Sequence, residues 1–243
     1  MKKIYLTSSL VNYIKMNGVR VPCVMDNTNC MVDILKSICN NGTNILLVAS
    51  SPEDYDKNDE MKQIMEKSFK MSDVLYHNMI MLDSRNEDDI VSYLDCSQLV
   101  ILLGGHLPTQ NNWFNRINLK DKIDAYDGFI IGQSAGSMNC ASNVYSCPEY
   151  EEDIENKRWI KGLGLTSINI FPHYNKYKDI YLGNLKMIDD IVIKDSYNNP
   201  VYALNDGSFI EINSNVIIHG ECFKIYNGKI SEICHNDEKI IIS

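Results

Sequence analysis

Residues 128–140 read Gly-Phe-Ile-Ile-Gly-Gln-Ser-Ala-Gly-Ser-Met-Asn-Cys. A short apolar run leads into Gly-x-Ser-x-Gly, and the small residues that follow can begin a helix. This is the nucleophile-elbow pattern, in which a serine lies on a sharp strand-to-helix turn with its hydroxyl raised above the sheet. Gly132 and Gly136 leave room where the strand packs against the start of the helix. The stretch therefore predicts an α/β fold with Ser134 as a catalytic nucleophile.

The residues before the elbow alternate apolar runs with amphipathic segments. The apolar runs predict strands at 4–7, 44–49, 78–82, 99–103 and 129–131. The segments between them predict helices over 30–39 and 88–94, and a longer helix that Ser51-Pro52-Glu53 caps and that continues to residue 70. Continuous apolar strands separated by helices are typical of a mostly parallel sheet with helices on both faces.

After Pro200 the pattern changes to short, β-branched segments separated by Asn, Gly and Asp. They predict strands at 201–204, 208–212, 215–219, 222–226, 229–233 and 238–242. Asn227-Gly228 is a strong signal for a hairpin turn. We expect these strands to form a C-terminal antiparallel extension of a single α/β domain spanning residues 1–243.

Composition narrows the class of protein and its partners. The chain has 243 residues and a net charge of −9, which disfavours a nucleic-acid partner because such proteins present basic surfaces. No run approaches the roughly 18 apolar residues that a membrane helix needs, and the N-terminal apolar run is too short for a signal peptide. We expect a cytoplasmic protein with no membrane partner. Its eight cysteines include no C-x-x-C pair and no Cys/His cluster with zinc spacing, so we expect no metal site.

A serine hydroxyl needs a base to take its proton, and the chain has five histidines. His173 follows an apolar strand that stops at Pro172. Active sites of open α/β sheets lie at such strand ends. His173 is therefore the expected general base.

A third group must orient the base and stabilise the imidazolium that forms. Two positions offer a carboxylate. Glu149 begins an acidic cluster that lies between Ser134 and His173, and Asp206 follows an apolar strand and precedes a glycine. The residues alone favour neither.

The oxyanion of an acyl-transfer reaction needs backbone N–H donors beside the nucleophile. Ala135 supplies one, because it follows the nucleophile directly. Gly104 and Gly105 end the apolar run before the elbow and are the candidates for the second. His106 follows this turn, where it either contacts substrate or begins a helix.

Together these residues resemble the peptidase E (aspartyl dipeptidase) family, which includes the cyanophycinases. Four features match in order between residues 98 and 210: Gly-Gly at 104–105, Gly-Gln-Ser-Ala-Gly at 132–136, Pro-His at 172–173 and Asp-Gly-Ser at 206–208. The resemblance implies a fold like that of class I glutamine amidotransferases. It also implies a triad of Ser134, His173 and Asp206, and it leaves Glu149 as an acidic residue near the site that contacts substrate.

The chain departs from the family pattern in two places. Its turn reads Gly-Gly-His-Leu-Pro-Thr-Gln-Asn, where the family more usually has Gly-Gly-Asn-Thr. The segment 174–188 offers lysines at 176, 178 and 186, but no counterpart of the arginine that aspartyl dipeptidases use to hold an acidic side chain. Because lysine does not reproduce the bidentate arginine fork, a preference for aspartate is not expected.

The predicted function is that of a serine peptidase acting on small peptides, as a dipeptidase or aminopeptidase-like enzyme. It proceeds through an acyl-enzyme on Ser134 and needs neither a metal nor an organic cofactor. Two alternatives stay open at this point. The same residues could act as an amidase, esterase or amidotransferase-like hydrolase on a non-peptide acyl group, or the fold could serve a non-catalytic binding protein.

Overall fold

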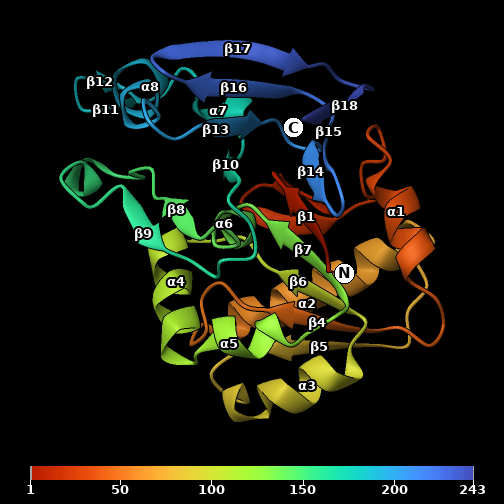
Figure 1. Cartoon of the computed structure of the whole chain (residues 1–243). Coiled ribbons are helices and arrows are strands. Elements are labelled where there is room, and N and C mark those ends of the chain that lie inside the picture. The colour runs from red at the N-terminus through yellow and green to blue at the C-terminus, as the bar shows by residue number, and fades with distance from the viewer. Residues whose placement is uncertain (1, 243) are drawn as a thin grey trace.

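The computed structural model describes residues 2–242 and centres on a large mixed sheet (Figure 1). Five neighbouring strands of this sheet are parallel, and three antiparallel strands continue it beyond β1. Within the described residues its spatial order is β18 (Lys239–Ile242), β15 (Val216–His219), β14 (Phe209–Ile212), β1 (Lys3–Thr7), β7 (Phe129–Gln133), β6 (Leu99–Leu102), β4 (Asn44–Val48) and β5 (Asn78–Leu82).

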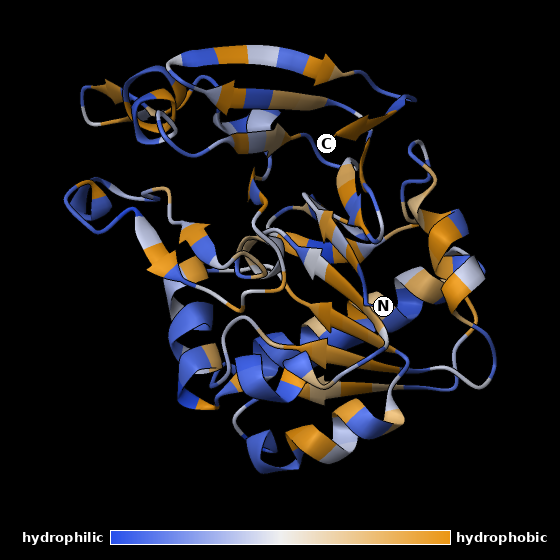
Figure 2. Cartoon of the chain, viewed as in Figure 1, coloured by the Kyte–Doolittle hydropathy of each residue, from blue (hydrophilic) through white to orange (hydrophobic). Residues whose placement is uncertain are grey.

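The central strands are mostly apolar, with polar residues at some of their ends (Figure 2). Every residue of β6 is buried, as is every residue of β4 after Asn44. Successive side chains of a strand point to opposite faces of the sheet, so both faces are covered here. This confirms the predicted α/β fold with a mostly parallel sheet.

The helices include the four that the sequence predicts, near residues 30–39, 51–70 and 88–94 and directly after Ser134. Their bounds are α1 (Met31–Ile38), α2 (Tyr55–Met71), α3 (Ile90–Cys96), α4 (Leu107–Arg116), α5 (Leu119–Asp124), α6 (Ala135–Met138), α7 (Tyr174–Tyr177) and α8 (Ile193–Asp195), with 3-10 turns at Glu87–Asp89 and Glu151–Asp153 and a π-helical segment at Met187–Val192. No helix between residues 2 and 242 has the length and apolar character needed to span a membrane.

The predicted start of the long helix is wrong by several residues. Residues 51–54 form a turn, closed by the hydrogen bond from the Asp54 N–H to the Ser51 carbonyl oxygen (3.1 Å). The helix α2 begins after this turn, and the Asp54 carboxylate caps it by accepting a hydrogen bond from the Lys57 N–H. Aspartate is as good an N-cap as serine, and the turn leaves Ser51 outside the helix.

The C-terminal strands pair with one another in antiparallel fashion as predicted, but they divide between two sheets. Only β14, β15 and β18 extend the large sheet. The smaller sheet has the order β10 (Asn169–Phe171), β13 (Val201–Leu204), β16 (Cys222–Tyr226) and β17 (Lys229–Cys234), with β10 and β13 parallel. The turn at Asn227-Gly228 joins β16 to β17 with positive φ at both residues, which confirms the predicted hairpin.

Three short hairpins complete the chain, and the sequence pattern predicts none of them. They are β2 (Tyr13–Met16) with β3 (Val19–Pro22), β8 (Asn143–Tyr145) with β9 (Trp159–Lys161), and β11 (Tyr181–Leu182) with β12 (Leu185–Lys186). A second, smaller hydrophobic cluster packs between the smaller sheet and the π-helical segment.

Candidate active site

Ser134 lies on the turn between β7 and α6. Its backbone has φ 50° and ψ −115°, a strained conformation for a residue with a side chain. The Ser134 N–H donates a hydrogen bond to the Thr7 carbonyl oxygen (3.0 Å), which ties the turn to the end of β1. A Cβ atom at Gly132 would overlap the backbone of Ser137, and one at Gly136 would overlap the Leu102 carbonyl oxygen. The elbow can therefore form only with glycine at these two positions.

The tight approach at Gly136 predicts a large effect of a single methyl group. Gly136→Ala is expected to destabilise the protein by about 1–3 kcal/mol, because the obstructing atom belongs to the backbone of a central strand. Thermal unfolding measures the effect. Gly42→Ala is the control, because a Cβ there meets only the end of the Asn40 side chain at 3.3 Å. A Gly136→Ala protein as stable as the Gly42→Ala protein would contradict this account of the elbow.

His173 and Asp206 reach Ser134 from two different strand ends. His173 follows β10 and Pro172 in a left-handed conformation (φ 58°), and Asp206 follows β13. The His173 Nε2 atom lies 3.0 Å from the Ser134 Oγ atom, and its Nδ1 atom lies 2.5 Å from the Asp206 Oδ1 atom. With the proton on Nδ1, the ring donates to the carboxylate and accepts from the serine hydroxyl. The three side chains thus form one continuous chain of hydrogen bonds.

The surroundings of Asp206 favour its ionised form. Partial burial raises the pKa of the carboxyl. The hydrogen bond and charge of His173, the hydrogen bond from Ser8 and the charge of Lys176 act in the opposite direction and outweigh it. The net result is a pKa below the usual value for aspartate, so the carboxylate is charged at neutral pH. A charged partner of this kind stabilises an imidazolium.

The Gly-Gly turn after β6 lies directly against the elbow. A Cβ atom at Gly104 would come within 3.1 Å of both the Gln133 carbonyl oxygen and the Ser134 Cβ atom, and one at Gly105 would overlap the Ser50 side chain. Both glycines line the same cavity as Ser134 and Ala135. The backbone of this turn therefore lies close to the nucleophile at Gly104 and packs against Ser50 at Gly105.

Glu149 and His106 lie outside the chain of hydrogen bonds that joins Ser134, His173 and Asp206. Glu149 lines the cavity with an exposed side chain. The carboxylate that bonds to the His173 Nδ1 atom belongs to Asp206 and not to Glu149. The pKa of the Glu149 carboxyl lies above its usual value, because desolvation and the charge of Asp153 raise it more than the charges of His106 and Lys176 lower it. The His106 ring bonds through Nδ1 to the Thr109 hydroxyl (2.7 Å) at the start of α4. Its position is therefore that of a helix-entry residue near Glu149.

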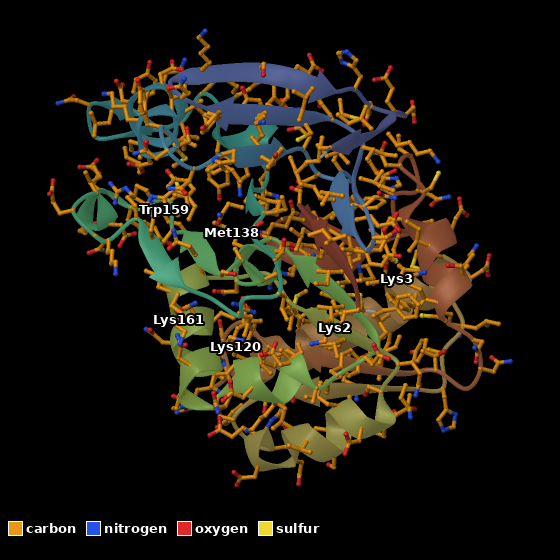
Figure 3. All side chains as sticks on the ribbon, viewed as in Figure 1. Lys2, Lys3, Lys120, Met138, Trp159 and Lys161 are labelled. Atoms are coloured by element: carbon orange, nitrogen blue, oxygen red, sulfur yellow. The ribbon has the colours of Figure 1, made fainter. Side chains whose placement is uncertain are left out.

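The cavity over the elbow has a volume of about 270 Å³. Its floor includes Met138 on α6, labelled in Figure 3. Its walls carry three cations and one carboxylate in a chain whose net charge is −9, namely Arg20, Lys57, Lys176 and Glu149. Sequence reasoning missed Arg20 and Lys57, because they come from the unpredicted hairpin β2–β3 and from the first turn of α2 and belong to no motif. Between residues 2 and 242, no group of three or more His, Cys, Asp or Glu side chains could hold a metal ion.

An elbow serine at the end of a mostly parallel sheet is the arrangement of a serine-type hydrolase built on an α/β fold. The model of peptidase family S51 matches residues 25–219, so the chain belongs to this family, the peptidase E family of serine peptidases.

Two solved structures share the fold across nearly the whole chain. One is a peptidase from an acI-B1 actinobacterium, with 14% sequence identity, a TM-score of 0.63, and coverage of 99% of this chain and 97% of the other. The second is a candidate peptidase E protein from Listeria monocytogenes EGD-e, with 16% identity, a TM-score of 0.58, and coverage of 96% and 99%. No curated protein matches the chain significantly.

Proposed function

We propose that the protein hydrolyses peptide bonds in small peptides through an acyl-enzyme, with Ser134 as nucleophile, His173 as general base and Asp206 as the orienting acid. One observation carries the proposal. The hydrogen bonds between Ser134 Oγ and His173 Nε2 and between His173 Nδ1 and Asp206 Oδ1 join these groups, and Ser134 and His173 line a single cavity. Such a chain is what a serine needs in order to lose its proton during attack.

The reaction follows from these positions. The Ser134 Oγ atom attacks the peptide carbonyl carbon while its proton passes to His173 Nε2. The N–H groups of Ala135 and of Gly105 or Gly104 stabilise the tetrahedral oxyanion. The C–N bond then breaks, and the imidazolium returns its proton to the leaving amine. Water attacks the acyl-enzyme by the same route and releases the acid.

The size and charge of the cavity support a short substrate with free termini. Its volume of about 270 Å³ lies just below the usual range of ligand sites, which is about 300–1,000 Å³. The Glu149 carboxylate in the cavity wall suits a free amino group. The cations Arg20 and Lys57 suit a carboxylate. A dipeptide or tripeptide satisfies both sets of charges at once.

Of the three cations that line the cavity, Arg20 has a guanidinium nitrogen without a hydrogen-bond partner among the described residues, and we expect it to bind the substrate carboxylate. Its Nη1 atom donates to Glu60 (2.9 Å), whereas its buried Nε atom has no hydrogen-bond partner among the described residues. Arg20→Ala is expected to raise KM for a dipeptide about 10- to 100-fold with little change in kcat, since a hydrogen bond to a charged group contributes about 1.5–3 kcal/mol. Steady-state kinetics on the free acid and on the C-terminal amide of one dipeptide measure this effect. With the amide as substrate, wild type and Arg20→Ala should have similar KM values.

A second variant separates substrate binding from a structural role of Arg20. Glu60→Ala breaks the same ion pair but leaves the guanidinium in place. It is expected to keep the preference for the free acid. Equal KM increases in Glu60→Ala and Arg20→Ala would assign the effect to the lost ion pair and would remove Arg20 from the substrate site.

A panel of substrates tests the proposed reaction against its alternatives. Purified protein is incubated with a dipeptide library, longer peptides, simple amides and esters, and the products are separated by mass. The proposal expects cleavage of dipeptides or tripeptides, with turnover falling as the peptide grows. Hydrolysis confined to non-peptide amides or esters would replace the proposed substrate class while keeping the same nucleophile.

A further inference from the structure

Ser8 is a buried serine that contacts two of the three groups in the hydrogen-bonded chain. It directly follows β1, and its side chain is 0% exposed. Its Oγ atom accepts a hydrogen bond from the His173 N–H (2.8 Å) and donates one to the Asp206 Oδ1 atom (2.9 Å). One hydroxyl thus links the backbone of the expected base to the side chain of the expected acid.

Both of these groups need an external constraint. His173 adopts φ 58°, a left-handed conformation that costs a residue with a side chain about 1–2 kcal/mol. Asp206 has a side chain that is 51% exposed, so burial alone does not fix its orientation. The hydrogen bond to Ser8 holds the backbone of the first, and the hydrogen bond from Ser8 holds the carboxylate of the second.

Thr7, the residue before Ser8, holds the turn that carries Ser134. The Thr7 carbonyl oxygen accepts the Ser134 N–H (3.0 Å), and the Thr7 hydroxyl donates to the Gly132 carbonyl oxygen (2.8 Å). Consecutive residues at the end of one central strand therefore contact Ser134, His173 and Asp206. These three groups come from segments that are far apart in the sequence. Their contacts with the end of β1 fix their positions relative to one another.

We propose that Ser8 is a positioning residue of this peptidase, which aligns His173 and Asp206 for proton transfer without contacting substrate. The inference rests on the proposed function, since it assumes that His173 and Asp206 act on Ser134. A misplacement of about 1 Å in such a site lowers the rate about 100-fold. A residue that sets the alignment should therefore affect turnover and leave substrate binding unchanged.

The test compares Ser8→Ala with the same substitution at a second buried serine. Ser8→Ala is expected to lower kcat for a dipeptide about 10- to 100-fold with KM within twofold of wild type, and to slow labelling by a serine-reactive phosphonate to the same degree. The control is Ser68→Ala, because Ser68 is also 0% exposed and donates to a backbone carbonyl, that of Cys23 (2.7 Å). It should keep the wild-type kcat.

A double-mutant cycle distinguishes positioning from a general loss of structure. In an Asp206→Asn background, the further effect of Ser8→Ala on labelling rate should fall to less than threefold, because the two residues act on one alignment. Should Ser8→Ala fail to fold, Ser8→Cys retains the volume with a much weaker hydrogen-bonding group and is expected to show the same loss.

Each outcome has one reading. A kcat within twofold of wild type in Ser8→Ala, an equal loss in Ser68→Ala, or full additivity with Asp206→Asn overturns the positioning role while the peptidase proposal stands. Wild-type protein that neither cleaves peptides nor reacts with the phosphonate overturns both.

Discussion

Ser134→Ala is expected to lower kcat for peptide hydrolysis by about 10⁴- to 10⁶-fold, the scale seen when a serine hydrolase loses its nucleophile. The reason is that no acyl-enzyme can form without the Oγ atom that lies 3.0 Å from His173 Nε2. Alanine keeps the backbone of the turn and removes one oxygen atom, so the folded structure should persist. Product formation followed by chromatography, together with the thermal midpoint, measures both effects.

The control for this variant is a serine a few residues further along the chain. Ser142 is exposed, and its hydroxyl bonds to the Thr166 carbonyl oxygen. Ser142→Ala should therefore keep the wild-type turnover. Turnover by Ser134→Ala within tenfold of wild type would show that another group carries the reaction.

Asp206→Asn is expected to lower kcat by about 10⁴-fold, because an amide cannot stabilise the imidazolium and favours the wrong tautomer of the ring. Steady-state kinetics on the best dipeptide of the panel measure the effect. Glu149→Gln is the matched comparison, since it neutralises the other carboxylate near the site. It should raise KM, with kcat falling less than tenfold. The reverse ranking of the two variants would transfer the orienting role to Glu149.

The same substitution has a predictable pH dependence in stability. The pKa of Asp206 is lower in the folded chain than its ordinary value of 3.8, so its charged form favours folding. Its contribution is fully present above about pH 4 and is lost as the pH falls through the lowered folded-state pKa. The difference in unfolding free energy between wild type and Asp206→Asn should therefore shrink below about pH 4. A difference that grows in that range would contradict the direction of the shift.

The sequence predicts the core of this fold well because local pattern and tertiary environment agree there. The run at residues 45–49 is apolar at every position, and such a run is stable only inside a sheet that is covered on both faces. The elbow is predicted for a related reason, since only glycine fits at 132 and 136. In both cases the residue types are compatible with only a few kinds of structure, so the local pattern predicts the structure.

The division of the C-terminal strands could not be predicted in this way. The segments at 201–204 and 208–212 look alike, yet β13 pairs with β10 and β14 pairs with β1. Strand pairing depends on partners distant in sequence, and a short β-branched segment does not encode which partner it meets. The hairpin β2–β3 was missed because all of its strand residues are exposed or half-buried, and no apolar face marks it.

The candidate site shows the same contrast. His173 could be singled out because Pro172 ends a strand at the edge where active sites lie. The choice of Asp206 over Glu149 needed the family resemblance, since both carboxylates have plausible positions in the sequence. Ser8 and Arg20 belong to no motif. The local sequence pattern does not indicate a hydroxyl that bridges two distant segments, so only the three-dimensional arrangement reveals it.

Covalent labelling of the nucleophile tests the central claim most directly. Wild-type, Ser134→Ala and His173→Ala proteins are incubated with a serine-reactive phosphonate, and the adduct is located by mass spectrometry of peptides. We expect one adduct per wild-type chain, on Ser134, none in Ser134→Ala, and a rate reduced at least 100-fold in His173→Ala. An adduct on another residue, or equal labelling of wild type and His173→Ala, would contradict the account.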